Sequence, residues 1–268
     1  MIQANIVLDS TMYGRRITTF ELVYPLIIHN QLLTHRMFSR SSQSSRAVPI
    51  KRMVEQTLAC PAIPERLYAK KRGMSPGLAL SDDRNNEALR LIRSHCDAAI
   101  ELAQKLDELG VHKQWANRYL SPFSHIRTVL TATELDNFFI QRISEDAQSE
   151  MNKLAYGMKV ALSQSTPEVR TRHIPYILDT EVNVDLVEKV KVSVARCARV
   201  SYDSFFTGIT STFEDDVRLY DFLVSEMHMS PLEHVAFTSG DDEMYDNFRG
   251  WISYRAIYKE FQEFVPYE

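Results

Sequence analysis

The residues best suited to chemistry lie in one short stretch, Gln31 to Arg46, where arginines alternate with hydroxyl side chains. Its three arginines, Arg36, Arg40 and Arg46, bracket six side chains with hydroxyl or amide groups: Ser39, Ser41, Ser42, Gln43, Ser44 and Ser45. Pro49 follows and predicts the start of a helix, since proline is tolerated in a first helical turn. Guanidinium groups, hydroxyls and the free N–H groups of a helix start together form a phosphate site. The composition alone also fits, and favours, a solvated and flexible Ser/Arg loop.

The charge distribution indicates the kind of ligand. The 268 residues carry 31 Lys and Arg against 35 Asp and Glu, a net charge of −4 that gives no indication of a nucleic-acid polymer. Up to Arg52, however, the bases are Arg15, Arg16, Arg36, Arg40, Arg46, Lys51 and Arg52, against the acids Asp9 and Glu21. A locally basic segment in a mildly acidic protein suits a small anionic ligand, although an uneven and fully solvated surface fits equally well.

The elements that must position these residues are those of an α+β fold, an antiparallel or mixed sheet packed with several helices. Alternating apolar and polar residues from Ile2 to Tyr24 predict a β-hairpin that turns near Tyr13-Gly14. Helices are predicted over 25–36, from Pro49 onward, over 86–109, over 132–161, near 184–198 and near 213–227, and a strand over 235–238. Residues 61–85 read as an irregular connection. We expect a single domain over 1–268, without a GxGxxG or GxxxxGK motif.

The cysteines and apolar segments indicate the compartment. Cys60, Cys96 and Cys197 are widely separated, which argues against a disulfide framework and favours a reducing compartment. The N-terminus lacks a signal-peptide pattern, and no apolar stretch has membrane-spanning length. We therefore expect a cytoplasmic protein without a membrane partner. No metal site is expected, because the histidines lack the i, i+4 helical spacing of a zinc motif.

The Ser/Arg stretch resembles the signature of the flavin-dependent thymidylate synthases, usually written RHRxxSxNExSxRY. The matching residues are His35, Arg36, Ser39, Ser44 and Arg46, and the upstream Thr19-Phe20, Pro25 and Gln31 have that family's spacing. Four positions differ: Thr34 stands for the first Arg, Ser41 for the Asn, Ser42 for the Glu and Ala47 for the Tyr.

Two further blocks extend the resemblance. The first is similar to the family's helical block ending NFxxLRxDSHAQxE, and it comprises Gly110-Val111, Asn117, Leu120, Arg127, Asn137-Phe138, Arg142, Ala147-Gln148 and Glu150, with Asp146 in place of the His. The second resembles ARVSF…HxTPFEHxxF, and it comprises residues 198–202 and 228–237. In the family this last block comes first. Its place here predicts a circular permutation, which is intelligible if the original termini lie close together.

The resemblance implies a substrate, cofactors and site residues. These are a pyrimidine deoxynucleoside monophosphate, FAD reduced by NADPH, methylenetetrahydrofolate as carbon donor, and a homo-oligomer, a tetramer in the family. It assigns Ser44, Ser45, Arg46 and Arg127 to the nucleotide phosphate and sugar, Gln31 and Arg142 to the base, and His35, Arg36, Ser42, Asn137, Ser201, Ser230 and Glu233 to the flavin. Arg142, which would polarise the base, and Ser44 are the expected catalytic residues. No cysteine lies in a recognisable nucleophile context, so polarisation with flavin reduction replaces covalent attack.

Alternatives remain at several points. The changes at Ser41 and Ser42 leave open dCMP methylation or hydroxymethylation of dUMP or dCMP, and the changes at Thr34 and Asp146 leave open a catalytically silent nucleotide-binding homologue. Arg142 could form a helical ion pair with Glu145 or Asp146, and Ser230-Pro-Leu-Glu233 could be a capping box. The aromatic C-terminal segment around Trp251 reads as packing and has no counterpart in the family blocks.

Overall fold

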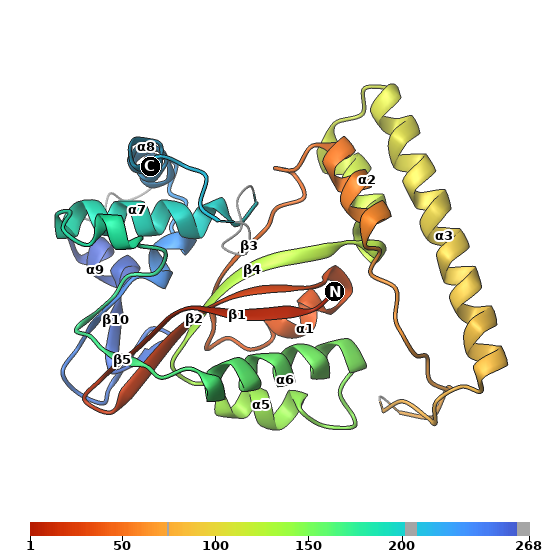
Figure 1. The fold of residues 1–268 in the computed structure, drawn as a ribbon, viewed down its shortest axis with the longest axis horizontal. Coiled ribbons are helices and arrows are strands. Elements are labelled where there is room, and N and C mark those ends of the chain that lie inside the picture. Colours follow the sequence, from red (N-terminus) through yellow and green to blue (C-terminus); the bar gives the residue numbers. More distant parts are fainter. Residues whose placement is uncertain (74, 202–207, 262–268) are drawn as a thin grey trace, which may run out of the picture.

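The computed structural model describes residues 1–73, 75–201 and 208–261, and a twisted sheet lies at its centre (Figure 1). Its strands, in the order β3-β4-β2-β1-β5, are β1 (Gln3–Met12), β2 (Arg15–Pro25), β3 (Ser39–Ser42), β4 (His125–Ala132) and β5 (Glu168–Val169). All neighbours in it are antiparallel except β5, which runs parallel to β1. The predicted hairpin is confirmed: Tyr13 and Gly14 at its tip have φ values of 50° and 76°, as a type I′ turn requires.

Helices surround this sheet on several sides (Figure 1). The α-helices are α1 (His29–Leu33), α2 (Ile50–Ala59), α3 (Asp82–Glu108), α4 (Lys113–Ala116), α5 (Asp136–Arg142), α6 (Ser149–Gln164), α7 (Leu186–Ala198), α8 (Phe213–Ser225) and α9 (Tyr254–Phe261). Short 3-10 helices are η1 (Leu26–Ile28), η2 (Asn117–Phe123), η3 (Asp179–Glu181), η4 (Arg199–Ser201) and η6 (Ser230–His234). The remaining strands are β6 (Arg172–His173), β7 (Ala236–Thr238), β8 (Met244–Tyr245), β9 (Phe248–Arg249) and β10 (Trp251–Ser253). This α+β arrangement confirms the predicted fold class.

Alternate residues of β2 face two different layers. Phe20, Leu22 and Tyr24 are fully buried in the main hydrophobic core, where they pack with residues of α5 and α6. Thr19 and Glu21, on either side of Phe20 in the sequence, lie on the opposite face of the strand. Both are buried as well. A buried polar group costs free energy unless it is hydrogen-bonded. The layer that covers this second face must therefore supply hydrogen-bonding partners, and it is formed by the C-terminal third of the chain.

A helical arm and the C-terminal layer complete the fold. The helices α2, α3 and η2 pack on each other beside the sheet around a separate cluster that includes Met53, Ile100 and Leu120 (Figure 1). In the C-terminal layer, Trp251 is fully buried and its Nε1 donates to the backbone oxygen of Arg15 at 3.2 Å. The packing role expected for this tryptophan is confirmed. No helix in the described ranges is long and apolar enough to cross a membrane.

Three expectations about elements are wrong. The predicted single helix over 132–161 is instead divided: Ala132 ends β4, and α5 and α6 are separated by the non-helical residues 143–148. The first part of the Ser/Arg loop is the strand β3, whose backbone pairs with β4 although its side chains are polar. The predicted helix over 25–36 is the 3-10 turn η1 followed by the five-residue α1. The helix after Pro49 and the helices near 184–198 and 213–227 are confirmed.

Candidate active site

Arg142, the last residue of α5, contacts the end of α1. Its Nε donates to Nε2 of His35 at 2.9 Å, and its Nη2 donates to Oγ1 of Thr34 at 3.2 Å and to the backbone oxygen of Gln31 at 3.4 Å. Phe138 packs edge-on against the His35 ring at a centroid distance of 4.9 Å, which ties the two helices together. The structure thus brings together the two residues assigned to the base and one assigned to the flavin.

The acceptors around Arg142 leave its charge unneutralised. The guanidinium donates to an imidazole, a hydroxyl and a carbonyl, and among the described residues Arg142 forms no ion pair with Glu145 or Asp146. Burial and the neighbouring charges of Arg142 and Arg40 lower the pKa of His35, which favours the neutral ring that accepts from Arg142. A guanidinium fixed by neutral groups keeps its full charge for a ligand oxygen.

The residues assigned to the phosphate lie on a short loop, residues 43–48, called the anion loop below. Ser44 Oγ accepts from the backbone N–H of Arg46 at 3.3 Å, and both residues are exposed. From the protein side, Nδ2 of the fully buried Asn117 donates to the backbone oxygens of Ser45 at 2.7 Å and Val48 at 2.9 Å. The loop therefore has a defined shape held by one buried amide, so the flexible Ser/Arg loop is not what the structure contains.

Arg127 borders a cavity of about 220 Å³ beside the anion loop, between the sheet and α2. Gln43 lines the same cavity and binds the strand: its N–H donates to the backbone oxygen of Arg127 at 2.8 Å, and its Oε1 accepts from the Arg127 N–H at 3.4 Å. Burial, together with the charge of Arg52, lowers the pKa of Arg127, while Glu21 opposes that shift. Ligand pockets commonly measure about 300–1,000 Å³. This cavity therefore suits part of a nucleotide rather than all of it.

A continuous chain of hydrogen bonds crosses the polar face of the sheet. Its five contacts measure 2.7 to 2.9 Å between heavy atoms and join six buried side chains: Ser41, His234, Thr131, Thr19, His173 and Ser10. Four of these side chains come from β3, β4, β2 and β1, and the two histidines enter from the covering layer. We call it the polar chain. It satisfies the polar groups that β2 and β4 bury on this face.

The polar chain makes the protein sensitive to acid. Burial lowers the pKa of His173 and of His234 from 6.5 to about 3. The unfolded chain therefore binds protons below pH 6.5 that the folded protein does not, and stability falls as the pH falls. Between pH 7.5 and 5.5 each imidazole should remove about 1.4 kcal/mol from the free energy of unfolding, roughly 3 kcal/mol together. Urea unfolding at both pH values measures this.

A single substitution tests that assignment. His173→Gln, which removes one of the two imidazoles, should reduce this pH-dependent loss by about 1.4 kcal/mol. A loss that is the same in His173→Gln as in the parent protein would mean that other groups cause the acid sensitivity.

The C-terminal block differs from the capping box considered above. Ser230 is exposed and is the first residue of η6, Met229 is the N-cap, and no side-chain cap is formed, so that alternative is wrong. Glu233 instead forms an ion pair with Arg255 of α9. Arg255 was not identified from the sequence, because it lies in the aromatic segment without a family counterpart.

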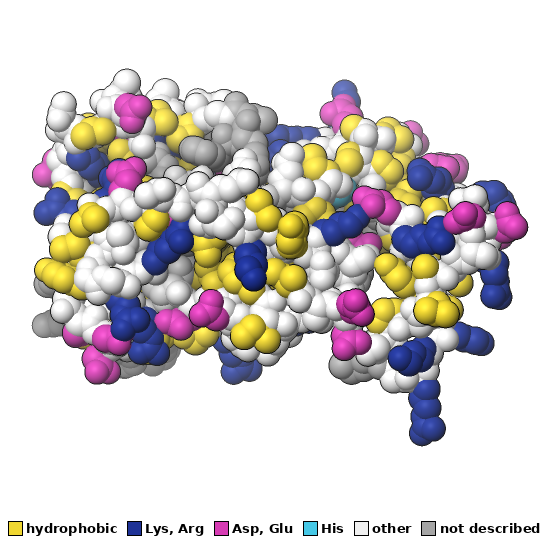
Figure 2. All heavy atoms as spheres, turned by 60° about the horizontal axis from the view of Figure 1, so that its bottom comes forward, with side chains coloured by type: hydrophobic (Ala, Val, Ile, Leu, Met, Phe, Trp, Pro, Cys, Tyr) yellow, Lys and Arg dark blue, Asp and Glu magenta, His cyan; other side chains and the backbone are white. Residues whose placement is uncertain are grey.

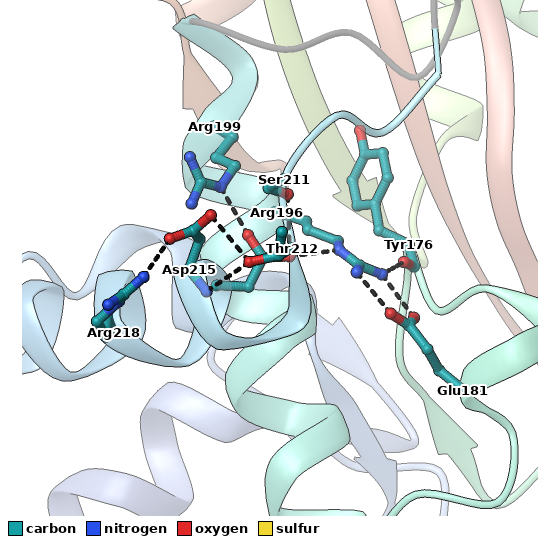
Figure 3. A network of polar contacts seen from close by, with 9 residues as sticks. Tyr176, Glu181, Arg196, Arg199, Ser211, Thr212, Asp215 and Arg218 are labelled. Atoms are coloured by element: carbon teal, nitrogen blue, oxygen red, sulfur yellow. Dashed lines mark hydrogen bonds and ion pairs between the residues drawn. The ribbon is translucent and has the colours of Figure 1, made fainter.

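A buried charged network holds the segment that leads to this block (Figure 3). Arg196 donates to Asp216 at 2.7 Å, to Glu181 at 2.6 and 2.7 Å and to the backbone oxygen of Tyr176 at 2.7 Å, and Arg199 donates to Asp216 at 2.6 Å. The network therefore fixes the start of η4. The side chain of Ser201, assigned to the flavin and located at the end of η4, lies outside the described residues.

A larger groove, of about 610 Å³, opens between residues 145–153 and the connection around residues 64–76. Asp146 lines it together with the acids Glu145 and Glu150 and the bases Arg66 and Lys153. The Asp at the position of the family's His therefore adds negative charge to this groove. Among the described residues, no three His, Cys, Asp or Glu side chains could hold a metal ion.

Comparison with known proteins identifies the family. Residues 16–168, more than half of the chain, match the family described as thymidylate synthase complementing protein. The chain belongs to this family. A curated relative, the flavin-dependent thymidylate synthase of Kosmotoga olearia, is 25% identical over 152 residues, which are 55% of this chain and 63% of the relative. The chain therefore covers less than two thirds of that relative's length.

This chain is also similar to solved structures. One is the crystal structure of a UMP/dUMP methylase, PolB from Streptomyces cacaoi, bound with 5-Br UMP, with a TM-score of 0.49 and 15% identity over 61% of this chain and 89% of that one. A second structure of that methylase, bound with 5-Br dUMP, gives a TM-score of 0.44 and 17% identity over 56% of this chain and 67% of that one.

The thymidylate synthase complementing match contains the first two sequence blocks and ends before the third. The structure nevertheless places the third block on the first, because His234 of η6 hydrogen-bonds with Ser41 of β3. The assigned residues form three groups: Gln31, His35 and Arg142 at α1 and α5; Ser44, Ser45, Arg46 and Arg127 at the anion loop; and Ser230 and Glu233 on η6.

Three of the residues assigned to the flavin, Arg36, Asn137 and Ser42, lie outside these groups. Arg36 and Asn137 are exposed, and Oδ1 of Asn137 accepts from Gln141 at 3.2 Å. Ser42 Oγ hydrogen-bonds with Thr128 Oγ1 at 3.0 Å.

Sequence reasoning missed the residues that support the site from behind. Arg40 donates to the backbone oxygens of Leu33 at 3.0 Å and His35 at 3.3 Å, so it caps the C-terminus of α1. A cation just after a short helix is a signal that could have been used. Asn117 and His234 lie in the matching blocks, but the sequence contains no sign of their buried partners.

Proposed function

We propose that this protein methylates C5 of a pyrimidine deoxynucleotide, converting dUMP to dTMP, with methylenetetrahydrofolate as carbon donor and NADPH-reduced FAD as reductant. The observation that carries the proposal is the Arg142 cluster. Gln31, His35 and Arg142 come from segments more than 100 residues apart, yet they meet with the guanidinium charge unneutralised. Membership of the thymidylate synthase complementing family supports the same reaction class.

The chain's own residues have separate tasks in this reaction. Arg142 addresses a ring carbonyl and stabilises the negative charge that develops when C5 acts as a nucleophile. Gln31 holds the base beside it, while Ser44, Ser45, Arg46 and Arg127 bind the phosphate and sugar through charge-assisted hydrogen bonds. Ser44, which is exposed on the anion loop where the nucleotide is proposed to bind, is the second proposed catalytic residue.

The residues fit a flavin in part. Arg36, Asn137 and Ser230 are exposed and suit the phosphates and polar edges of FAD, whereas His35, Ser42 and Glu233 already have protein partners. Arg36 supplies the positive charge that a pyrophosphate needs. The bound flavin supplies the hydride that completes the methyl group.

Two of the three cysteines are unsuited to covalent attack, whereas Cys60 is half-buried and lines the cavity beside Arg127. Burial raises the pKa of Cys197, which is fully inside the protein, and burial raises the pKa of Cys96. A thiol attacks only as the thiolate, so neither side chain is suited to be a nucleophile at neutral pH.

An oligomer is part of the proposal. The three groups of assigned residues lie on different parts of one chain, and α5 and α6 expose large apolar side chains, with Ile140 75% and Tyr156 59% exposed. On the face in Figure 2, hydrophobic side chains are interspersed with both signs of charge, which suits a protein partner better than a polyanion. We propose a homotetramer of permuted subunits in the cytoplasm.

The choice of base rests on Gln31 and Arg142. Ser41 and Ser42, whose presence suggested dCMP or a hydroxymethyl product, hydrogen-bond with His234 and Thr128. Their hydroxyls serve the packing of β3, so these two changes alone do not favour another base. Separate turnover assays with dUMP and dCMP distinguish the substrates.

An absorbance spectrum tests the proposed function. After incubation with FAD and removal of the unbound FAD, the purified protein should show the visible absorbance bands of a flavin, because the family uses this cofactor. Absence of those bands with excess FAD, together with nucleotide binding, would indicate a silent nucleotide-binding homologue instead.

Arg46→Ala should weaken binding of the nucleotide monophosphate by about 1.5–3 kcal/mol, the usual loss for a hydrogen bond to a charged group. The affinity for FAD should change much less, because Arg46 is assigned to the phosphate of the nucleotide. Calorimetric titration of both ligands measures the difference. Equal affinity of the parent protein for the monophosphate and the bare nucleoside would contradict a phosphate site in the anion loop.

A further inference from the structure

His234 joins the C-terminal layer to the strand that leads into the anion loop. Its Nε2 hydrogen-bonds with Oγ of Ser41 at 2.9 Å, and its Nδ1 with Oγ1 of Thr131 at 2.9 Å. The ring is fully buried, and so is Thr131. One imidazole therefore links β3, β4 and η6 at a point where water cannot replace a lost hydrogen bond.

The strand β3 needs such a link. It contains four residues and lies at the edge of the sheet, so its backbone pairs with β4 on one side only. A short edge strand is weakly held by its own backbone bonds. Asn117 fixes the far end of the anion loop, at Ser45 and Val48. The near end is fixed by β3, which the covering layer contacts at Ser41 through His234 at 2.9 Å and at Ser39 through Asn247, whose Nδ2 donates to Ser39 Oγ at 3.3 Å.

We propose that His234 is a positioning residue for the nucleotide: through Ser41 it fixes β3, and through β3 it sets the anion loop for the phosphate. The inference rests on the proposed function, because it takes the phosphate to bind at Ser44 and Arg46. His234 itself is buried behind the strand and does not touch the ligand.

His173 provides an internal control. It belongs to the same polar chain and is equally buried, but its partners are Thr19 on β2 and Ser10 on β1, on the far side of β4 from the anion loop. Loss of either histidine destabilises the fold. Only loss of the hydrogen bond between His234 and Ser41 should weaken nucleotide binding.

Two substitutions separate the two hydrogen bonds of His234. The amide nitrogen of Gln reaches the position of Nε2 and retains the contact to Ser41, whereas that of Asn reaches the position of Nδ1 and retains the contact to Thr131. His234→Asn should weaken dUMP binding about tenfold, the effect of one hydrogen bond, and His234→Gln should weaken it less than about threefold. Ser41→Ala, a milder change, should behave like His234→Asn. His173→Asn and His173→Gln should leave the dissociation constant unchanged at a temperature where every variant is folded.

Trypsin gives a readout that needs no nucleotide. Cleavage after Arg46, which is exposed on the anion loop, should be several times faster in His234→Asn and Ser41→Ala than in His234→Gln or either His173 variant. If the parent protein binds no dUMP, the proposed function fails, and these cleavage rates still decide whether His234 positions the loop. Equal cleavage and equal affinity in His234→Asn and His234→Gln, or the same losses in the His173 variants, would overturn the proposal.

Discussion

Replacing Arg142 with alanine should lower kcat about 10²- to 10³-fold while the dissociation constant for dUMP changes less than about tenfold. The reason is the setting of the guanidinium. His35, Thr34 and the backbone of Gln31 hold it in place without neutralising it, so in the proposed reaction its charge is available to the carbonyl where negative charge would develop. Single-turnover kinetics with a separate binding titration measure the two effects.

Lysine should not restore the activity of the Arg142 variant. Nε of the guanidinium donates to His35, and Nη2 donates to the backbone oxygen of Gln31 in α1. The planar group still presents its remaining N–H groups to a ligand. An ammonium group has no such planar arrangement and cannot make both sets of contacts. Arg90→Ala, which removes an exposed helical arginine, is the matched control and should leave kcat unchanged. Normal turnover in Arg142→Ala together with an essential cysteine would point to covalent catalysis.

The sequence predicts one face of this fold well and the other face poorly. Phe20, Leu22 and Tyr24 alternate with polar residues, so the hairpin and its apolar face could be read directly. The opposite face buries Thr19 and Thr131, which look like exposed positions in a strand. Their burial depends on His173 and His234, which approach from distant parts of the chain. The hydrophobic periodicity shows which residues are polar. It does not show whether a polar residue will be buried with a hydrogen-bonding partner.

The sequence likewise predicts some residues of the candidate site and not others. The anion loop and Arg142 could be found from residue types and from family resemblance, because ligand-binding groups must have a particular chemistry. The groups that orient them could not: Ser41 and His234 are 193 residues apart in sequence, and Arg255 lies in a segment without a family counterpart. Many side chains could in principle hold a strand or a carboxylate from behind. Only the folded structure selects which one does so.

The largest loss of stability is expected from Asp216→Asn. Asp216 is fully buried and its carboxylate accepts from Arg196 at 2.7 Å, from Arg199 at 2.6 Å and from Ser211 at 3.0 Å (Figure 3). Asparagine has the same shape but no charge, so the two guanidinium groups would keep only Glu181 as a buried counter-charge. Removing one partner from a buried ion pair costs about 3–5 kcal/mol. Urea unfolding at neutral pH measures this.

The neighbouring Asp215 supplies the matched control for Asp216→Asn. Asp215 is on the same turn of α8, but it pairs with the exposed Arg218 across one helical turn, where solvent screens the interaction. Asp215→Asn should therefore leave the urea midpoint nearly unchanged. Because Arg199 begins η4, Asp216→Asn should also increase hydrogen exchange at the backbone of η4 beyond the change expected from global stability. Equal, small effects of the two substitutions would mean that the buried network is dispensable and that hydrophobic packing of α7 against α8 holds this layer.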